Sequence, residues 1–100
     1  MVALEEAVME IIVNAGQSRS LCFEALHAAR QGNLDEAKNL LREADGYARQ
    51  AHKMQTKLIE QDAGEARQPM TLIMVHAQDH LMNSLLAREL SEEIIHLYQR

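Results

Sequence analysis

Three side chains that can do chemistry, His76, Asp79 and His80, lie within five residues of an otherwise apolar segment. The two histidines are four residues apart, so on a helix their imidazoles would share one face, as in helices that supply two ligands to zinc. A neutral imidazole can also act as a nucleophile and form a covalent intermediate. A third interpretation gives His76 only a structural place on the helix. The spacing alone leaves all three interpretations open.

Asp79 interrupts a run of apolar residues that are mostly three or four positions apart. They are Leu72, Val75, Met82, Leu86, Leu90 and Leu97. Such spacing predicts one continuous apolar stripe along a helix. An ionised carboxylate in an apolar seam is strongly disfavoured unless a metal ion, a basic partner or protonation offsets its charge. Asp79 is therefore expected to bind a metal ion, to pair with a basic group or to be protonated.

The composition favours one small all-α domain over residues 1–100. Helix formers dominate, 47% of the chain is hydrophobic and only 3% is aromatic. The net charge of −5 argues against a nucleic-acid binder and against an anionic membrane surface as partner. We expect no membrane insertion, because no apolar stretch approaches the ~20 residues of a span, and no signal peptide. The lone Cys22 fits a reducing cytoplasm.

Apolar periodicity predicts a first helix from about residue 2 to about residue 31. The pattern resumes after Gly16, so we expect one helix with a bend allowed there, although glycine costs about 1 kcal/mol relative to alanine. Gly32 is expected to end this helix. Asn33 is then expected to cap the next one, with Glu36 completing a capping box.

The second helix is expected over about 34–61, followed by a loop over 62–68. The third helix is expected to begin at Pro69, since proline is well tolerated at the first helical position, and to end near Gln99. The short first connection forces the first two helices to lie antiparallel. The sequence therefore predicts an up-down-up three-helix bundle of rods that are each about 45 Å long.

The beginning of the third helix, residues 70–75, is apolar nearly all the way round. A helix that is apolar on every side must be covered on every side, which two partner helices cannot do. We therefore expect self-association. A closed homo-oligomer would bring the third helices, and Asp79, together about its axis.

The segment Val75-His76-Ala77-Gln78-Asp79-His80-Leu81-Met82 resembles the active-site signature of a family of bacterial proteins. The family is the lactose/cellobiose-type IIA component of the phosphoenolpyruvate-dependent sugar phosphotransferase system. Residues 11–20, 55–65 and 84–90 resemble other segments of the same family. The resemblance covers nearly the whole chain, and the motif positions show no departure from the family.

The resemblance implies a role for each polar residue of the motif. His76 matches the histidine that takes a phosphoryl group from the phosphocarrier HPr and passes it to a cysteine of the cognate IIB. Gln78 and His80 would orient that histidine or hydrogen-bond the phosphoryl oxygens. Asp79 matches the aspartate that meets its symmetry mates around a divalent cation, typically Mg²⁺, in the family's homotrimer. Hard oxygen ligands suit magnesium, and the ion would offset the buried charge.

The resemblance thus implies a cytoplasmic phosphotransferase component that assembles as a homotrimer, a nine-helix bundle. It would support uptake of a β-linked disaccharide (cellobiose, chitobiose or lactose) through a membrane IIC permease. Two other functions stay open. One is a small zinc-binding hydrolase that uses His76 and His80, although the sequence offers no obvious third ligand. The other is a non-catalytic helical interaction module, which would take up no covalent phosphate.

Overall fold

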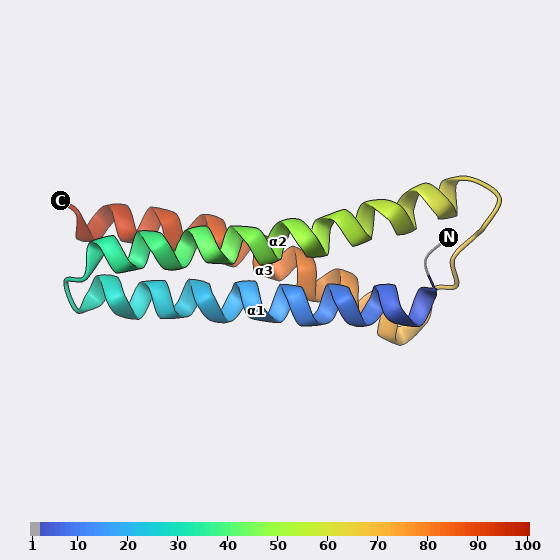
Figure 1. Ribbon diagram of the computed structural model, residues 1–100, viewed down its shortest axis with the longest axis horizontal. Helices are drawn as coiled ribbons and strands as arrows, with labels where there is room; N and C mark the ends of the chain where they lie inside the picture. The colour runs from blue at the N-terminus through green and yellow to red at the C-terminus, as the bar shows by residue number, and fades with distance from the viewer. Residues whose placement is uncertain (1–2) are drawn as a thin grey trace.

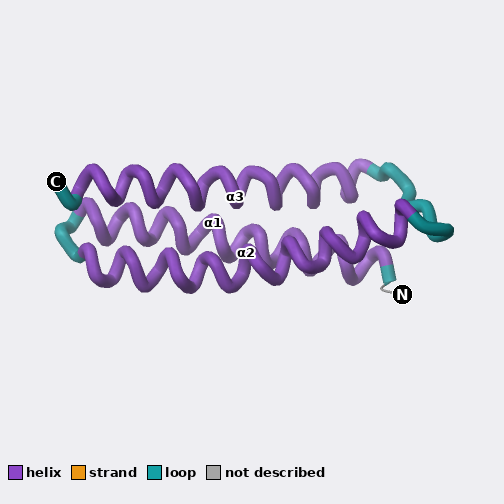
Figure 2. Tube along the Cα trace, turned by 90° about the horizontal axis from the view of Figure 1, so that it is seen from above, coloured by secondary structure: helices purple, strands orange, loops and turns teal. Residues whose placement is uncertain are grey.

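The computed structural model describes residues 3–100 and consists of three long helices, α1 (Leu4–Arg30), α2 (Leu34–Ala63) and α3 (Leu72–Tyr98). The helices run up-down-up alongside one another in a rod of 51 × 19 × 18 Å (Figures 1 and 2). No residue from 3 to 100 is in a strand, so the predicted all-α three-helix bundle is confirmed. Across this range, none of the helices has the length and apolar character that a membrane span requires.

Helix α1 runs without a break through Gly16, so the prediction of a single first helix is confirmed. Residue 2, where that helix was expected to begin, lies outside the described residues. Gly32 ends the helix with a φ of +87°, a conformation that glycine adopts without steric cost. The Gly32 N–H donates to the Ala29 carbonyl at 3.0 Å and the Asn33 N–H to the Ala28 carbonyl at 2.9 Å. This pair of bonds is a Schellman motif, and it reverses the chain within a few residues.

Asn33 occupies the N-cap position of α2 as predicted, but its side chain makes no capping hydrogen bond. The expected capping box with Glu36 is therefore wrong. The reason is that Asn33 also completes the Schellman motif, and its ψ of 69° differs from the extended conformation of a typical capping residue. Asn33 thus belongs both to the end of α1 and to the start of α2. Its backbone conformation is the one that the Schellman motif at the end of α1 requires.

The connection between α2 and α3 covers residues 64–71 instead of the predicted 62–68, because α2 continues to Ala63. The loop is tied to the end of α2 by Asp62, whose Oδ1 accepts a hydrogen bond from the Gln68 N–H at 2.7 Å. Figure 1 places this loop at the opposite end of the rod from the α1–α2 turn and the C-terminus.

Helix α3 begins at Leu72, so the prediction that Pro69 takes the first helical position is wrong. Thr71 is the N-cap, and its Oγ1 accepts a hydrogen bond from the Met74 N–H at 3.2 Å. A threonine hydroxyl satisfies an otherwise unpaired N–H at a helix start, whereas proline offers only a compatible φ. The cap therefore sets the boundary, and Pro69 remains in the loop.

The core consists of two apolar clusters on either side of a polar layer. One cluster, near the α2–α3 loop, includes Ile11, Leu58 and Leu81. The other, near the α1–α2 turn, includes Cys22, Leu41, Ala44 and Ile95. Between them along the helices lie two fully buried serines, Ser18 and Ser84. Many core positions hold alanine or serine, and such small side chains let the helix backbones approach closely.

Helix α3 buries a face other than the apolar stripe that its sequence displays. The six residues of that stripe are each between 46% and 86% exposed in the single chain. The buried residues lie on another face, and they are Met74, Ala77, Leu81, Ser84, Ser91 and Ile95. Helix α3 therefore carries two apolar faces, and its own chain covers only one of them.

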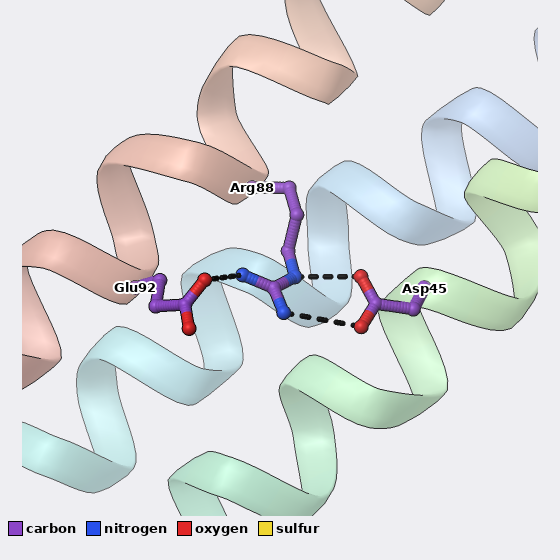
Figure 3. Close-up of polar contacts among 3 residues, drawn as sticks. All are labelled: Asp45, Arg88 and Glu92. Atoms are coloured by element: carbon purple, nitrogen blue, oxygen red, sulfur yellow. Dashed lines mark hydrogen bonds and ion pairs between the residues drawn. The ribbon is translucent and has the colours of Figure 1, made fainter.

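A charged bridge joins α3 to α2, the two helices that contact each other least. Arg88 follows Ser84 by four residues and precedes Ser91 by three, so it lies in register with the buried face of α3. Its guanidinium binds Asp45 of α2 through two bonds, Nε to Oδ1 at 2.6 Å and Nη2 to Oδ2 at 3.1 Å (Figure 3). Its third nitrogen donates to Glu92 at 2.7 Å. The bidentate geometry aligns the two helices at this level.

Candidate functional site

The two motif histidines lie together near the start of α3. His76 is exposed and His80 is half-buried. Their ring centroids are 5.3 Å apart and the ring planes are nearly perpendicular, at 89°. Neither imidazole makes a hydrogen bond or an ion pair with any other side chain of residues 3–100. The exposed ring of His76 can therefore be approached from solvent, with the ring of His80 at its edge.

Helix α1 supports the site through Gly16. A methyl group added at Gly16 would lie 3.9 Å from Cε1 of His80, so the imidazole rests over the glycine. The His80 ring therefore packs beside α1 at the level of Gly16, where even an alanine would make only an ordinary contact. From the sequence, Gly16 was identified as a position where α1 could bend and as part of the matching segment 11–20. Its place beside His80 depends on the packing of two helices, which the spacing along one helix does not reveal.

Gln78 points away from the two histidines, toward α2. Its Oε1 accepts a hydrogen bond from Nε2 of Gln55 at 2.5 Å, and its own amide nitrogen lies 3.7 Å from the sulfur of Met74. Residues two apart on a helix face in different directions, which explains why Gln78 and His76 diverge. Within one chain, Gln78 links α3 to α2. Gln55, its partner, was not singled out from the sequence except as part of a longer matching segment.

Asp79 is exposed in the single chain and has no hydrogen-bond or ion-pair partner among residues 3–100. It lies between Val75 and Met82 on the uncovered apolar stripe, as the spacing predicts. Its burial is therefore a property only of an assembly in which another molecule covers that stripe.

The single chain does not gather a conventional multi-ligand metal site. No three His, Cys, Asp or Glu side chains come together anywhere in residues 3–100. A catalytic zinc site usually takes three protein ligands, and here one chain supplies two imidazoles. A zinc hydrolase built on His76 and His80 would therefore lack a third ligand from its own chain.

An apolar groove of about 320 Å³ lies between the end of α2 and the start of α3, on the side of α3 that carries Gln78, and neither His76 nor His80 lines it. Its apolar lining residues are Leu58, Ile59, Met70, Met74 and Val75, and its polar ones are Asp62, Gln68 and Gln78. Met70 is 81% exposed at the mouth of the groove, and methionine adapts its shape to different partners. The apolar surface next to the exposed His76 is instead that of Leu72 and Ile73, which are exposed one turn earlier on the same face of α3, an arrangement suited to contact with another protein.

Comparison with known proteins agrees with the resemblance seen in the motif. The chain is 50% identical over 97 residues to the "PTS system N,N'-diacetylchitobiose-specific EIIA component" of Escherichia coli (strain K12), which covers 97% of this chain and 84% of the relative. It is 42% identical to the "Lichenan-specific phosphotransferase enzyme IIA component" of Bacillus subtilis (strain 168), with 97% of this chain and 88% of the relative covered.

Solved structures share the fold over the whole length. The crystal structure of the PTS cellobiose-specific enzyme IIA from Bacillus anthracis superposes with a TM-score of 0.94 at 37% identity, covering 99% of this chain and 91% of that one. The IIA(Chitobiose) subunit solved in complex with HPr from Escherichia coli superposes with a TM-score of 0.85 at 48% identity, with 99% and 96% covered. Residues 6–99 match the family described as "PTS system, Lactose/Cellobiose specific IIA subunit". The resemblance is confirmed, and the chain belongs to the lactose/cellobiose-specific IIA family of the phosphotransferase system.

Proposed function

We propose that this protein carries phosphoryl groups on His76. A ring nitrogen of His76 attacks the phosphorus of phospho-HPr, a new P–N bond forms and the bond to the donor breaks. A cysteine of the cognate IIB then takes the phosphoryl group as a thiophosphate, which frees His76 for the next cycle. The observation that carries this proposal is the exposed imidazole of His76, which has no side-chain partner among residues 3–100 and lies in the segment that resembles the family's active-site signature.

The geometry supports this chemistry because phosphoryl transfer depends mainly on positioning and on stabilising charge. In each transfer, the attacking atom, the phosphorus and the leaving atom must lie roughly in line. Because the donor HPr and the acceptor IIB are different proteins, both must be able to reach the ring of His76 in turn. The exposure of His76 meets that requirement. His80, at the edge of the His76 ring, is placed to orient it or to donate to a phosphoryl oxygen. Gln78 reaches the site only by turning away from Gln55.

We propose further that three copies associate through the uncovered stripe of α3. Asp79 then meets its counterparts on the symmetry axis, where one Mg²⁺ would offset the three negative charges. The donor set fits this ion, because a carboxylate is the hard oxygen ligand that magnesium prefers and Asp79 has no competing partner among the described residues of its own chain. When bound, the ion would supply charge neutralisation at the axis and take no part in the transfer at His76.

The names of the relatives support a proposal for the class of sugar that this protein helps to take up, but not for one particular sugar. Their names specify N,N'-diacetylchitobiose, lichenan, lactose and cellobiose systems. We propose that the chain serves the uptake of a β-linked disaccharide (cellobiose, chitobiose or lactose) in the cytoplasm, where HPr and IIB would be its direct partners. The membrane IIC permease would carry the sugar, and the chain would not contact the sugar itself.

The test is phosphorylation by phosphoenolpyruvate, enzyme I and HPr, using labelled phosphoenolpyruvate and purified protein. The wild type should take up the label, and His76→Ala should take up none while keeping its helical circular dichroism. His52→Ala is the matched control, because His52 is also an exposed helical histidine but lies on α2. Equal labelling of wild type and His76→Ala would refute the assignment. An unlabelled wild type would favour the interaction module.

The assembly is tested with Asp79→Leu. An apolar side chain suits an apolar seam, so this variant should lose the metal and keep, or strengthen, the trimer. Light scattering after size-exclusion chromatography gives the molar mass, and metal analysis gives the Mg²⁺ content. Dissociation of Asp79→Leu into monomers would contradict the axial position proposed for Asp79.

A further inference from the structure

We propose that His76 and His80 together form a Zn²⁺-binding site, and that zinc bound there blocks phosphoryl transfer. The blocking effect rests on the proposed function of His76, whereas the binding itself does not. The site is separate from the one proposed for Mg²⁺ at Asp79, because it uses imidazole nitrogens in place of carboxylate oxygens. Its ligands come from one helix of one chain.

The distance between the two rings already matches a shared zinc ion. A zinc–imidazole nitrogen bond of about 2.1 Å places each ring centroid roughly 3.2 Å from the metal. At a tetrahedral angle, two such centroids lie about 5 Å apart. The ring centroids of His76 and His80 are 5.3 Å apart, so the rings already lie at the spacing that one shared ion requires. Both side chains would turn about their own bonds to direct one nitrogen each toward the ion.

The surroundings favour chelation over other uses of these rings. Neither His76 nor His80 has a side-chain hydrogen bond within the described part of the chain that would have to be broken. The other three histidines, His27, His52 and His96, have no histidine three or four positions away. This pair is therefore the only one in the sequence with the spacing that chelates a metal on a helix.

The chemistry selects a transition metal over magnesium. Imidazole nitrogen suits Zn²⁺, Cu²⁺ and Ni²⁺, whereas Mg²⁺ prefers oxygen and gives up its water reluctantly. Two imidazoles and two waters would complete a tetrahedral zinc ion. The ring nitrogen of His76 that attacks phosphorus would also be the zinc ligand, and its one lone pair cannot bind zinc and phosphorus at the same time. Zinc and the phosphoryl group then compete, and by linkage phosphorylation of His76 must weaken zinc binding as zinc opposes phosphorylation.

The first experiment measures zinc binding to the purified full-length protein by titration against a chromogenic zinc indicator, with no phosphoryl donor present. Wild type should bind Zn²⁺, and excess Mg²⁺ should not displace it. His76→Gln and His80→Gln should each weaken binding by at least about tenfold, because the second ligand binds at high effective concentration only when the first is present. His52→Gln is the matched control and should bind zinc as the wild type does.

The second experiment adds pre-formed, purified phospho-HPr to the protein with and without Zn²⁺. Zinc should lower the phosphorylation of the wild type, and a chelator should restore it. In His80→Gln, zinc should lower phosphorylation by a much smaller fraction, measured against the same variant without zinc. Unaltered zinc affinity in both histidine variants, or no zinc binding by wild type, would overturn the site even if His76 is phosphorylated. Zinc binding without phosphorylation of the zinc-free protein would instead overturn the proposed function, and with it the blocking role.

Discussion

Replacing Ser18 by alanine should stabilise the protein, although it removes a polar group from the core. Ser18 is 0% exposed and its Oγ has no hydrogen-bond partner among the described residues. A buried hydroxyl without a partner costs about 1–3 kcal/mol, and alanine also has a better helix propensity than serine. The loss of one oxygen leaves little space to fill. We expect Ser18→Ala to raise the free energy of unfolding by about 1–2 kcal/mol.

The assay is urea unfolding followed by circular dichroism, at one fixed protein concentration because association would add to the stability. At about 4–8 °C per kcal/mol for a domain of this size, the thermal midpoint should rise visibly. Ser84→Ala is the matched control, since Ser84 is equally buried but its hydroxyl donates to the Leu81 carbonyl at 2.7 Å. Ser84→Ala should therefore gain less. A destabilised Ser18→Ala would refute the reasoning, because it would mean that the hydroxyl has a partner, such as a buried water.

Three other substitutions test separate parts of the structure. Gly16→Ala should stabilise α1 by up to about 1 kcal/mol in thermal unfolding, and should keep phosphorylation, since the added carbon makes only an ordinary contact with His80. Lost phosphorylation would contradict that packing. Arg88→Leu should lower the free energy of unfolding by about 1–2 kcal/mol in urea, because Asp45 loses two hydrogen bonds while staying partly solvated. An unchanged value would mean that the bridge aligns the helices without net stabilisation. Burial raises the pKa of the Cys22 thiol above its ordinary 9.0. The unfolded chain therefore loses this proton at lower pH, so stability should fall as pH rises past 9.0 in the wild type and fall less in Cys22→Ala. Equal slopes in the two proteins would contradict the shift.

The helices could be predicted from the sequence because apolar periodicity and a glycine stop are local signals. Gly32 ends α1 as expected, since only glycine adopts its positive φ without strain. The start of α3 could not be placed as well, because Pro69 and Thr71 are both local start signals and nothing local ranks them. The hydrogen bond from the Met74 N–H to the Thr71 side chain decides between them.

Predicting that α3 is a helix was easier than predicting which of its faces packs into the core. The large residues of the stripe give the strongest periodic signal, yet they face away from the chain's own core. The buried face includes Ala77, Ser84 and Ser91, whose small side chains carry little hydrophobic signal but allow close helix packing. Periodicity reveals apolar faces, and it does not say which face belongs to the chain's own core.

The candidate site was predictable as a motif but not as an arrangement. Spacing correctly places His76 and His80 side by side, because both belong to one helix. The positions of Gly16 against His80 and of Gln55 against Gln78 depend on packing between helices. Such contacts join residues far apart in the sequence, and no local pattern in a single chain specifies them.

The most direct measurement of the central claim locates the phosphoryl group itself. The wild-type protein is incubated with phosphoenolpyruvate, enzyme I and HPr, digested under alkaline conditions that preserve phosphohistidine, and analysed by tandem mass spectrometry. Our account predicts one phosphorylated residue, His76. A phosphoryl group found only on another residue, or on none while HPr in the same tube is phosphorylated, would contradict it.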